Sequence, residues 1–190
     1  MAELVIGHSR DPLVHPGLRL LLFRLGPDRR MTLQPPCAGK SERTKMDPEI
    51  ILLNVLRPGG EKIGVCLKLT ELDRDICRLA VAWPVGGLER TFDAPDFYEC
   101  LRAFRRVVEP EGFRVLCQGA RPNVCPSGMS SAAGAWKCWA HKFGEPAASR
   151  DQLVATFDPV EDINAVGTVA EQDEWIARHW EAFKARTSAR

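Results

Sequence analysis

Two stretches of alternating apolar and polar residues constrain the fold of this chain more than any other feature. Residues 62–70 carry an apolar side chain at every second position, and residues 76–83 repeat the pattern. A period of two places successive side chains on opposite faces of a β-strand. The run LDRD between the two stretches suits a tight turn. The pattern therefore predicts an antiparallel hairpin with one buried face.

Two amphipathic helices are predicted to cover that face. Apolar residues recur at helical spacing through residues 94–109, after a helix-start run of Asp, Ala, Pro and Asp. Thr168 and Glu171 form a capping box that opens a second helix over residues 169–185. The first helix is expected to have a solvated face that carries Arg102, Arg105 and Arg106. The last helix is expected to bury Ile176, Trp180 and Phe183, with Trp175 beside them and His179 facing the surface.

Further strands are predicted over residues 113–118 and 135–143, with a shorter one over 152–157. Residues 50–56 follow a run of Asp, Pro and Glu that is typical of a helix start, so they favour a helix, with a buried strand as the alternative. Together these elements predict a single α+β domain over residues 46–190. We expect an antiparallel four- to five-stranded sheet with two main helices packed on one face.

Residues 1–45 differ from the rest of the chain. They lack sustained periodicity and carry a net charge of +4, whereas the remainder carries −3. This segment is predicted to be a weakly ordered arm. Met46 is an alternative start of the chain, which would make the arm an over-extended reading frame.

Composition excludes several classes of partner. The net charge of +1 gives no general attraction to nucleic acid or to a membrane surface. No apolar run approaches the roughly 20 residues that span a bilayer. No secretory signal is visible, and the seven scattered cysteines suit reduced thiols. We therefore expect a cytoplasmic protein with neither a nucleic-acid nor a membrane partner.

The tract over residues 113–143 concentrates the residues that could carry chemistry. Cys117, Cys125, Cys138 and His141 are a chemically suitable set for a tetrahedral zinc ion. Their spacing lacks the usual paired knuckles, and residues three apart on a strand point to opposite faces, which separates Cys138 from His141. We expect no metal and no cofactor, and keep this set as the alternative.

A cysteine nucleophile is a second candidate in the same tract. Cys125 lies in a predicted loop, where a thiol near a helix start can have a lowered pKa. His141 would be its general base and Asp158 would orient that base. No signature of a known cysteine enzyme surrounds Cys125, so catalysis here is the alternative to an inert thiol.

Binding of an anion or a protein is a third candidate. Backbone amides at Ser127 and Gly128 could form an anion nest, with charge from Arg121, although a tight turn explains the same residues. Trp136 and Trp139 fall on opposite faces of the predicted strand, so one is expected in the core and the other exposed or covered by a helix. The candidate binding residues are Arg121, Asn123, Ser127, Gly128, Trp136 and Trp139.

The stretch GFRVLCQGARPNVCPSGMSSAAGAWK, with LVATFDP and VGTVAEQDEW after it, resembles small uncharacterised bacterial proteins. These have a strand, a G-A-R-x-N-x-x-P-S-G-M loop and a second strand that leads to a C-terminal helix. The resemblance covers roughly the last 80 residues and implies no activity. Small proteins of this build include immunity proteins that neutralise toxins. We therefore hypothesise a non-enzymatic protein-interaction module, regulatory or immunity-like, with the Cys125 enzyme as the alternative.

Overall fold

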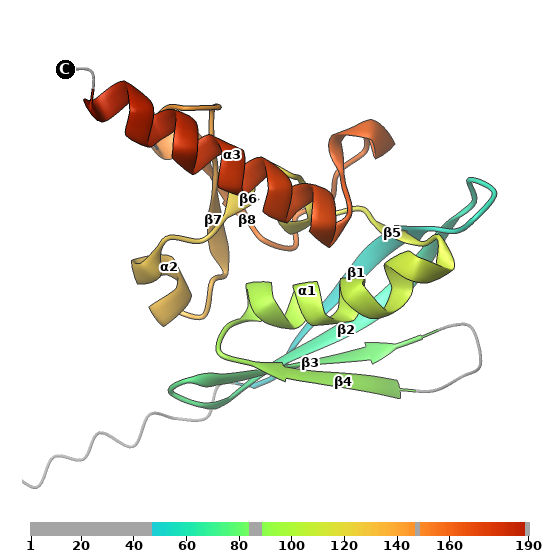
Figure 1. Ribbon diagram of the computed structural model, residues 1–190. Helices are drawn as coiled ribbons and strands as arrows, with labels where there is room; N and C mark the ends of the chain where they lie inside the picture. The colour runs from blue at the N-terminus through green and yellow to red at the C-terminus, as the bar shows by residue number, and fades with distance from the viewer. Residues whose placement is uncertain (1–46, 84–88, 147–148, 189–190) are drawn as a thin grey trace, which may run out of the picture. The chain divides into compact units, whose positions relative to one another are not determined.

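A computed structural model describes residues 47–83, 89–146 and 149–188 (Figure 1). The described residues belong to one compact unit, Arg43–Arg190. The predicted arm over residues 1–45 lies outside them. The fold is α+β, as predicted: a curled antiparallel five-stranded sheet, a second small sheet, and helices that pack on one face of the larger sheet.

The larger sheet has the strand order β4-β3-β2-β1-β5. Its centre is the predicted hairpin of β2 (Lys62–Asp73) and β3 (Ile76–Ala82), which pair antiparallel. The alternation predicted from the sequence is confirmed, because the apolar side chains on one face of the hairpin are buried against α1. These are Val65, Leu67 and Leu69 of β2, and Cys77, Leu79 and Val81 of β3.

The helix predicted over residues 50–56 is wrong. This run forms strand β1 (Glu49–Leu56), which pairs with β2 along its whole length. Leu53 and Val55 enter the core while Ile50 and Leu52 face away from it. The alternation of burial has a period of two, so burial and pairing with β2 override the local helix-start signal.

The remaining strands are short, and two of them, over residues 89–94 and 124–125, were not predicted. Strand β4 (Glu89–Ala94) pairs with β3 at one edge of the larger sheet, and β5 (Arg114–Val115) pairs with the end of β1. The predicted strands over 135–143 and 152–157 are present as β7 (Lys137–Ala140) and β8 (Leu153–Ala155). They join β6 (Val124–Cys125) in a separate three-stranded sheet instead of extending the larger one.

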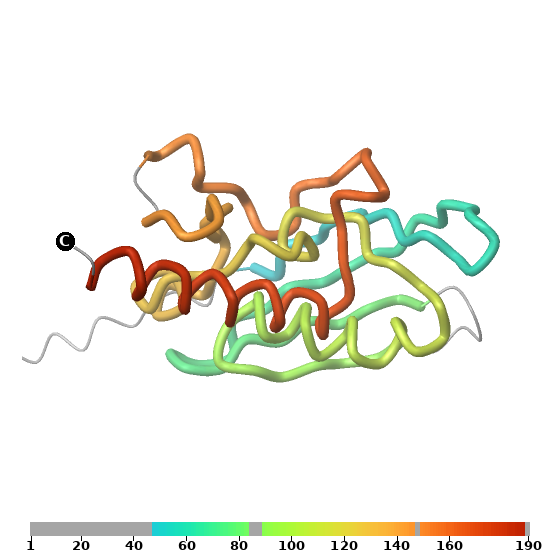
Figure 2. Tube along the Cα trace, turned by 45° about the horizontal axis from the view of Figure 1, so that its top comes forward, coloured from blue at the N-terminus to red at the C-terminus, as the bar shows by residue number. Residues whose placement is uncertain are grey.

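Helix α1 (Phe97–Val108) lies between the larger sheet and the rest of the unit (Figures 1 and 2). Its predicted start is confirmed, since the Asp96 carboxylate accepts the Glu99 N–H at 2.8 Å. Leu101 and Phe104 pack on the larger sheet. Tyr98 points the other way, into a small core over the second sheet, where its hydroxyl donates to the Val124 carbonyl at 2.9 Å.

Helix α3 (Val169–Ser188) runs alongside α1 on the same side of the sheet (Figure 2). Its capping box is confirmed: the Glu171 N–H donates to Thr168 Oγ1 at 3.1 Å, and the Thr168 N–H donates to Glu171 Oε2 at 2.6 Å. Short helices connect these elements: η1 (Glu109–Glu111), η2 (Gln118–Ala120), α2 (Gly128–Ala132), η3 (Arg150–Gln152) and η4 (Ile163–Ala165). No helix of the described residues is both long and apolar enough to cross a membrane.

Candidate functional site

The loop and strands between α1 and α3 hold most of the residues singled out in the sequence. Cys117 and Cys138 are fully buried small side chains, in the main core and the small core respectively. Cys138 Sγ lies 3.3 Å from Thr156 Oγ1. Within the described residues, no group of three or more His, Cys, Asp or Glu side chains could hold a metal ion. Cys117, Cys125, Cys138 and His141 are therefore not gathered as a ligand set.

Cys125 lies at the end of β6, opposite Trp139 of β7. Burial raises the pKa of its thiol to about 11, and Arg102 opposes this only in part. In the described part of the chain, no hydrogen bond joins Cys125 to His141 or His141 to Asp158. Asp158 is exposed, and its backbone carbonyl accepts the Gln118 N–H at 2.9 Å. A thiol of this pKa is almost entirely protonated at neutral pH, and so a weak nucleophile.

The candidate binding residues of the loop are engaged in holding its shape. Ser127 Oγ caps α2 by accepting the Ser130 N–H at 3.1 Å, and Gly128 begins that helix. Arg121 Nη1 donates to Gln118 Oε1 at 2.9 Å. Asn123 bonds the chain after β7: its side chain donates to the His141 carbonyl at 3.0 Å and its own carbonyl accepts the His141 N–H at 2.8 Å.

Trp136 and Trp139 are both half-buried. Trp136 packs against Phe97 with ring centroids 4.4 Å apart, and its indole N–H donates to Glu71 Oε1 at 3.4 Å. It belongs to the edge of the main core. The large exposed aromatic side chains of the described residues lie elsewhere, on α3 and after β7.

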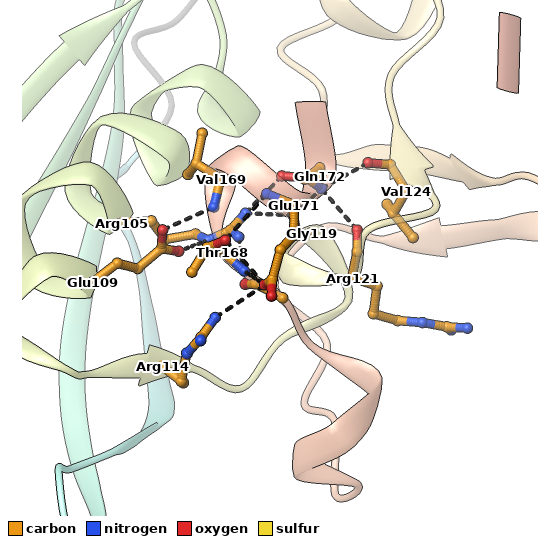
Figure 3. A network of polar contacts seen from close by, with 11 residues as sticks. Arg105, Glu109, Arg114, Gly119, Arg121, Val124, Thr168, Val169, Glu171 and Gln172 are labelled. Carbon is orange, nitrogen blue, oxygen red and sulfur yellow. Dashed lines mark hydrogen bonds and ion pairs between the residues drawn. The ribbon is translucent and has the colours of Figure 1, made fainter. Parts of the chain in front are cut away.

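A buried polar network fixes the loop between α1 and α3, and the sequence interpretation missed it (Figure 3). Arg105 was expected on a solvated face, but its side chain is fully buried. Its guanidinium donates to Glu109 Oε1 at 2.8 Å and to Gln172 Oε1 at 2.7 Å. It also donates to the carbonyls of Gly119 and Gly167, at 3.3 and 2.8 Å.

Gln172 and Glu109 extend this network to the neighbouring backbone (Figure 3). The Gln172 amide donates to three carbonyls at 2.8–3.1 Å, those of Gly119, Arg121 and Val124. The second Glu109 oxygen accepts the Val169 N–H at 2.8 Å, at the start of α3. The network therefore joins α1, the loop and the first turn of α3 by hydrogen bonds that are made within the protein.

The middle of α3 and the chain after β7 carry an aromatic patch, which we define as Phe143, Trp175, Trp180 and Phe183. Trp180, predicted to be buried, is 39% exposed, and Phe143 is 51% exposed. Trp175 and Phe183 are half-buried. Neighbouring rings meet edge to face, with centroids 5.8 Å apart for Phe143–Trp175 and for Trp180–Phe183.

Two buried histidines lie beneath the aromatic patch, and His179 had been expected at the surface. The ring centroids of His141 and His179 are 4.9 Å apart, and His179 stacks on Trp175. His179 Nδ1 accepts the Gly144 N–H at 3.1 Å, which requires a neutral ring. Burial lowers the pKa of both histidines, and the neighbouring His179 lowers that of His141 further.

Pairs of opposite charge surround the aromatic patch. Arg178 lies over the Phe143 ring at 5.8 Å and pairs with Glu174. Lys184 pairs with Glu181 at 2.9 Å, and Arg186 of α3 pairs with Glu145 of the chain after β7. The patch thus has aromatic side chains with a charged rim of paired cations and carboxylates.

Comparison of the chain with protein-family models finds no match, and comparison with curated proteins finds none either.

Proposed function

We propose that this chain is a cytoplasmic, non-enzymatic protein-interaction module that binds an apolar surface of a partner protein through the aromatic patch. The observation that carries the proposal is the exposure of Trp180 on α3 and of Phe143 in the chain after β7. Exposed aromatic side chains that cluster within a charged rim are typical of protein–protein contact surfaces.

Rigidity of the aromatic patch supports a binding role. Trp180 contacts both buried histidines, with ring centroids 4.8 Å from His179 and 5.7 Å from His141. A side chain held in place by its neighbours loses little conformational entropy when a partner covers it. Trp and Arg are the residues most often found at the energetic centres of such interfaces.

Charge at the rim indicates the chemistry of the partner. The cations Arg178, Lys184 and Arg186 each have a carboxylate partner on the same surface. Paired charges create little net field, so the patch suits neither the phosphates of nucleic acid nor an anionic membrane. We infer a protein partner with an apolar groove, whose binding depends little on salt.

The free and mostly buried thiols support the cytoplasmic location and the non-enzymatic role that we propose. Six cysteines lie in the described residues and all are free. Burial raises the pKa of Cys117 and Cys125 to about 11 and that of Cys138 to about 12. Unreactive thiols of this kind behave as small core side chains, and free thiols are typical of a reducing compartment.

Pull-down of the tagged full chain from its native host, followed by binding of the purified partner by calorimetry, tests the proposal. Trp180→Ala is expected to weaken the partner's binding at least about 30-fold, because hot-spot residues contribute 2 kcal/mol or more. Phe143→Ala is expected to weaken it less.

Met129→Ala is the matched control, since Met129 is exposed on α2 outside the aromatic patch. It should leave binding unchanged. Thermal unfolding of all three variants separates loss of binding from loss of the fold. A partner that binds Trp180→Ala as tightly as the unaltered chain would overturn the assignment of this surface.

A further inference from the structure

Half of strand β1 has a free edge. On one side β1 pairs with β2 along its whole length. On the other side β5 pairs only with Val55 and Leu56, and the Leu116 N–H donates to the Asn54 carbonyl at 2.9 Å. Among residues 47–83, 89–146 and 149–188, no strand pairs with residues 49–53 on that side.

The free edge coincides with exposed apolar side chains. The N–H and C=O of one residue in an antiparallel strand point toward the same neighbouring strand, and successive residues alternate. The Asn54 carbonyl points toward β5, so Ile50 and Leu52 direct their backbone groups toward the free edge. Their side chains are 69% and 77% exposed, on the sheet face opposite α1.

This edge lacks the features that usually prevent edge-to-edge pairing. Residues 50–53 contain no charged residue and no proline, so Pro48 and Glu49 stand only at the end of the free edge, and the register of β1 against β2 is continuous, without a bulge. Sheet proteins ordinarily protect exposed edges with such residues or with a bulge. An apolar, regular and unprotected edge is a surface to which another strand can be added.

We propose that a second copy of this chain adds its own β1 to this edge, antiparallel, across a two-fold axis through Ile51. Pro48 has no N–H, and the Asn54 carbonyl is already bonded to Leu116, so both limits of the free edge lie three residues from Ile51. The free edge is therefore symmetric about Ile51, as a two-fold contact between identical surfaces requires.

In this register Ile50 of one copy lies opposite Leu52 of the other. Each pair exchanges two backbone hydrogen bonds, and the exposed apolar side chains cover one another. Glu49 lies opposite Leu53, so no like charges face each other across the contact. The two five-stranded sheets become one continuous sheet. A contact this short gives a weak dimer, whose population depends on protein concentration.

Sedimentation velocity of the full chain, from about 5 to about 500 µM, tests the dimer. The apparent mass is expected to rise with concentration from 21.2 kDa toward about twice that value. A double variant, Ile50→Lys with Leu52→Lys, places lysine opposite lysine and is expected to weaken association at least about tenfold. The corresponding double glutamate variant is expected to do the same.

Sedimentation of an equimolar mixture of the two double variants is the most direct test. Lysine then lies opposite glutamate, so association is expected to return. Ile76→Lys is the control: Ile76 is exposed on β3, away from the free edge, and its change should leave the dimer intact. Trp180→Ala should also leave it intact, so this inference and the proposed function fail independently.

Circular dichroism verifies that each variant is folded. Leu52→Pro is a second variant, which removes only the N–H that faces the free edge and spares the pairing of β1 with β2. It is expected to weaken the dimer as well. A chain that stays monomeric at every concentration, or a dimer that survives both the lysine pair and Leu52→Pro, would overturn the proposal. So would a mixture of the charged variants that fails to associate.

Discussion

Arg105 is a buried charge whose hydrogen-bond partners all lie within the protein. Its guanidinium bonds two side chains, Glu109 and Gln172, and two backbone carbonyls, those of Gly119 and Gly167. A buried ion pair adds little net stability, because desolvation offsets the attraction between its charges. Removal of one member is costly all the same, since the other remains buried without its counter-charge.

Arg105→Met should lower the free energy of unfolding by about 3–5 kcal/mol, because it leaves Glu109 as an uncompensated buried carboxylate. Urea unfolding at neutral pH measures the loss. Arg106→Met is the control: Arg106 is exposed on the same helix, and its replacement should change stability by less than about 0.5 kcal/mol. Equal losses in the two variants would show that the network does not stabilise the fold.

The pattern of apolar residues in the sequence does not predict the burial of Arg105 or the exposure of Trp180. Helical periodicity groups Ile176, Trp180 and Phe183 on one stripe of α3, but the residues that are buried include Gln172 and His179. These polar residues can be buried because they form hydrogen bonds with backbone groups that are distant in the sequence. Gln172 bonds to the Val124 carbonyl, and His179 bonds to the Gly144 N–H. Such partners are set by tertiary structure, so hydrophobicity alone identifies the wrong face.

Elements whose signal is local were predictable, and elements defined by distant partners were not. The hairpin of β2 and β3 follows from two adjacent runs of alternating apolar residues that a turn joins. Helix α1 has an N-cap residue and a stripe of apolar residues within its own sequence. Strand β1 becomes a strand through its pairing with β2 and β5, and its sequence equally fits a helix start. The candidate patch was missed for the same reason, since Phe143 approaches α3 only in the folded chain.

The short helix η2 packs closely between α1 and β8, and Gly119 allows this close approach. A Cβ atom at Gly119 would lie 2.8 Å from Leu101 Cδ2 and 3.0 Å from the Thr156 carbonyl oxygen. Neither distance is compatible with ordinary packing. The absence of a side chain therefore lets the loop that carries Arg121 and Val124 reach the network of Arg105.

Gly119→Ala is expected to cost about 1–3 kcal/mol of stability, since the new methyl group must displace well-packed neighbours. Gly128→Ala is the matched control, because a Cβ there meets nothing within 4 Å. That change should be neutral or stabilise by up to about 1 kcal/mol, through the entropy of the unfolded chain. Denaturant midpoints of the two variants measure the difference, and a neutral Gly119→Ala would contradict the tight packing of η2.

The unit holds its two sheets together through α1 and α3, and the histidine pair lies where α3 meets the chain after β7 (Figure 1). His141 and His179 are neutral in this position, for burial lowers the pKa of each below its ordinary value of 6.5. In the unfolded chain both regain that value. The unfolded state therefore binds protons that the folded state excludes, and acid favours unfolding.

The stability contributed by this pair is fully present above about pH 6.5 and is lost as the pH falls through that value toward the lower folded pKa. The free energy of unfolding should therefore decline as the pH falls below about 6.5. Carboxylates with lowered pKa values, such as Asp93 and Glu171, lose their contribution to stability only as the pH falls through their ordinary pKa values of 3.8 and 4.5.

Urea unfolding at several pH values measures the decline. His141→Phe keeps an aromatic ring and removes one titrating group, so its decline should be shallower. An identical pH dependence in both proteins would mean that the pair does not link acid to unfolding.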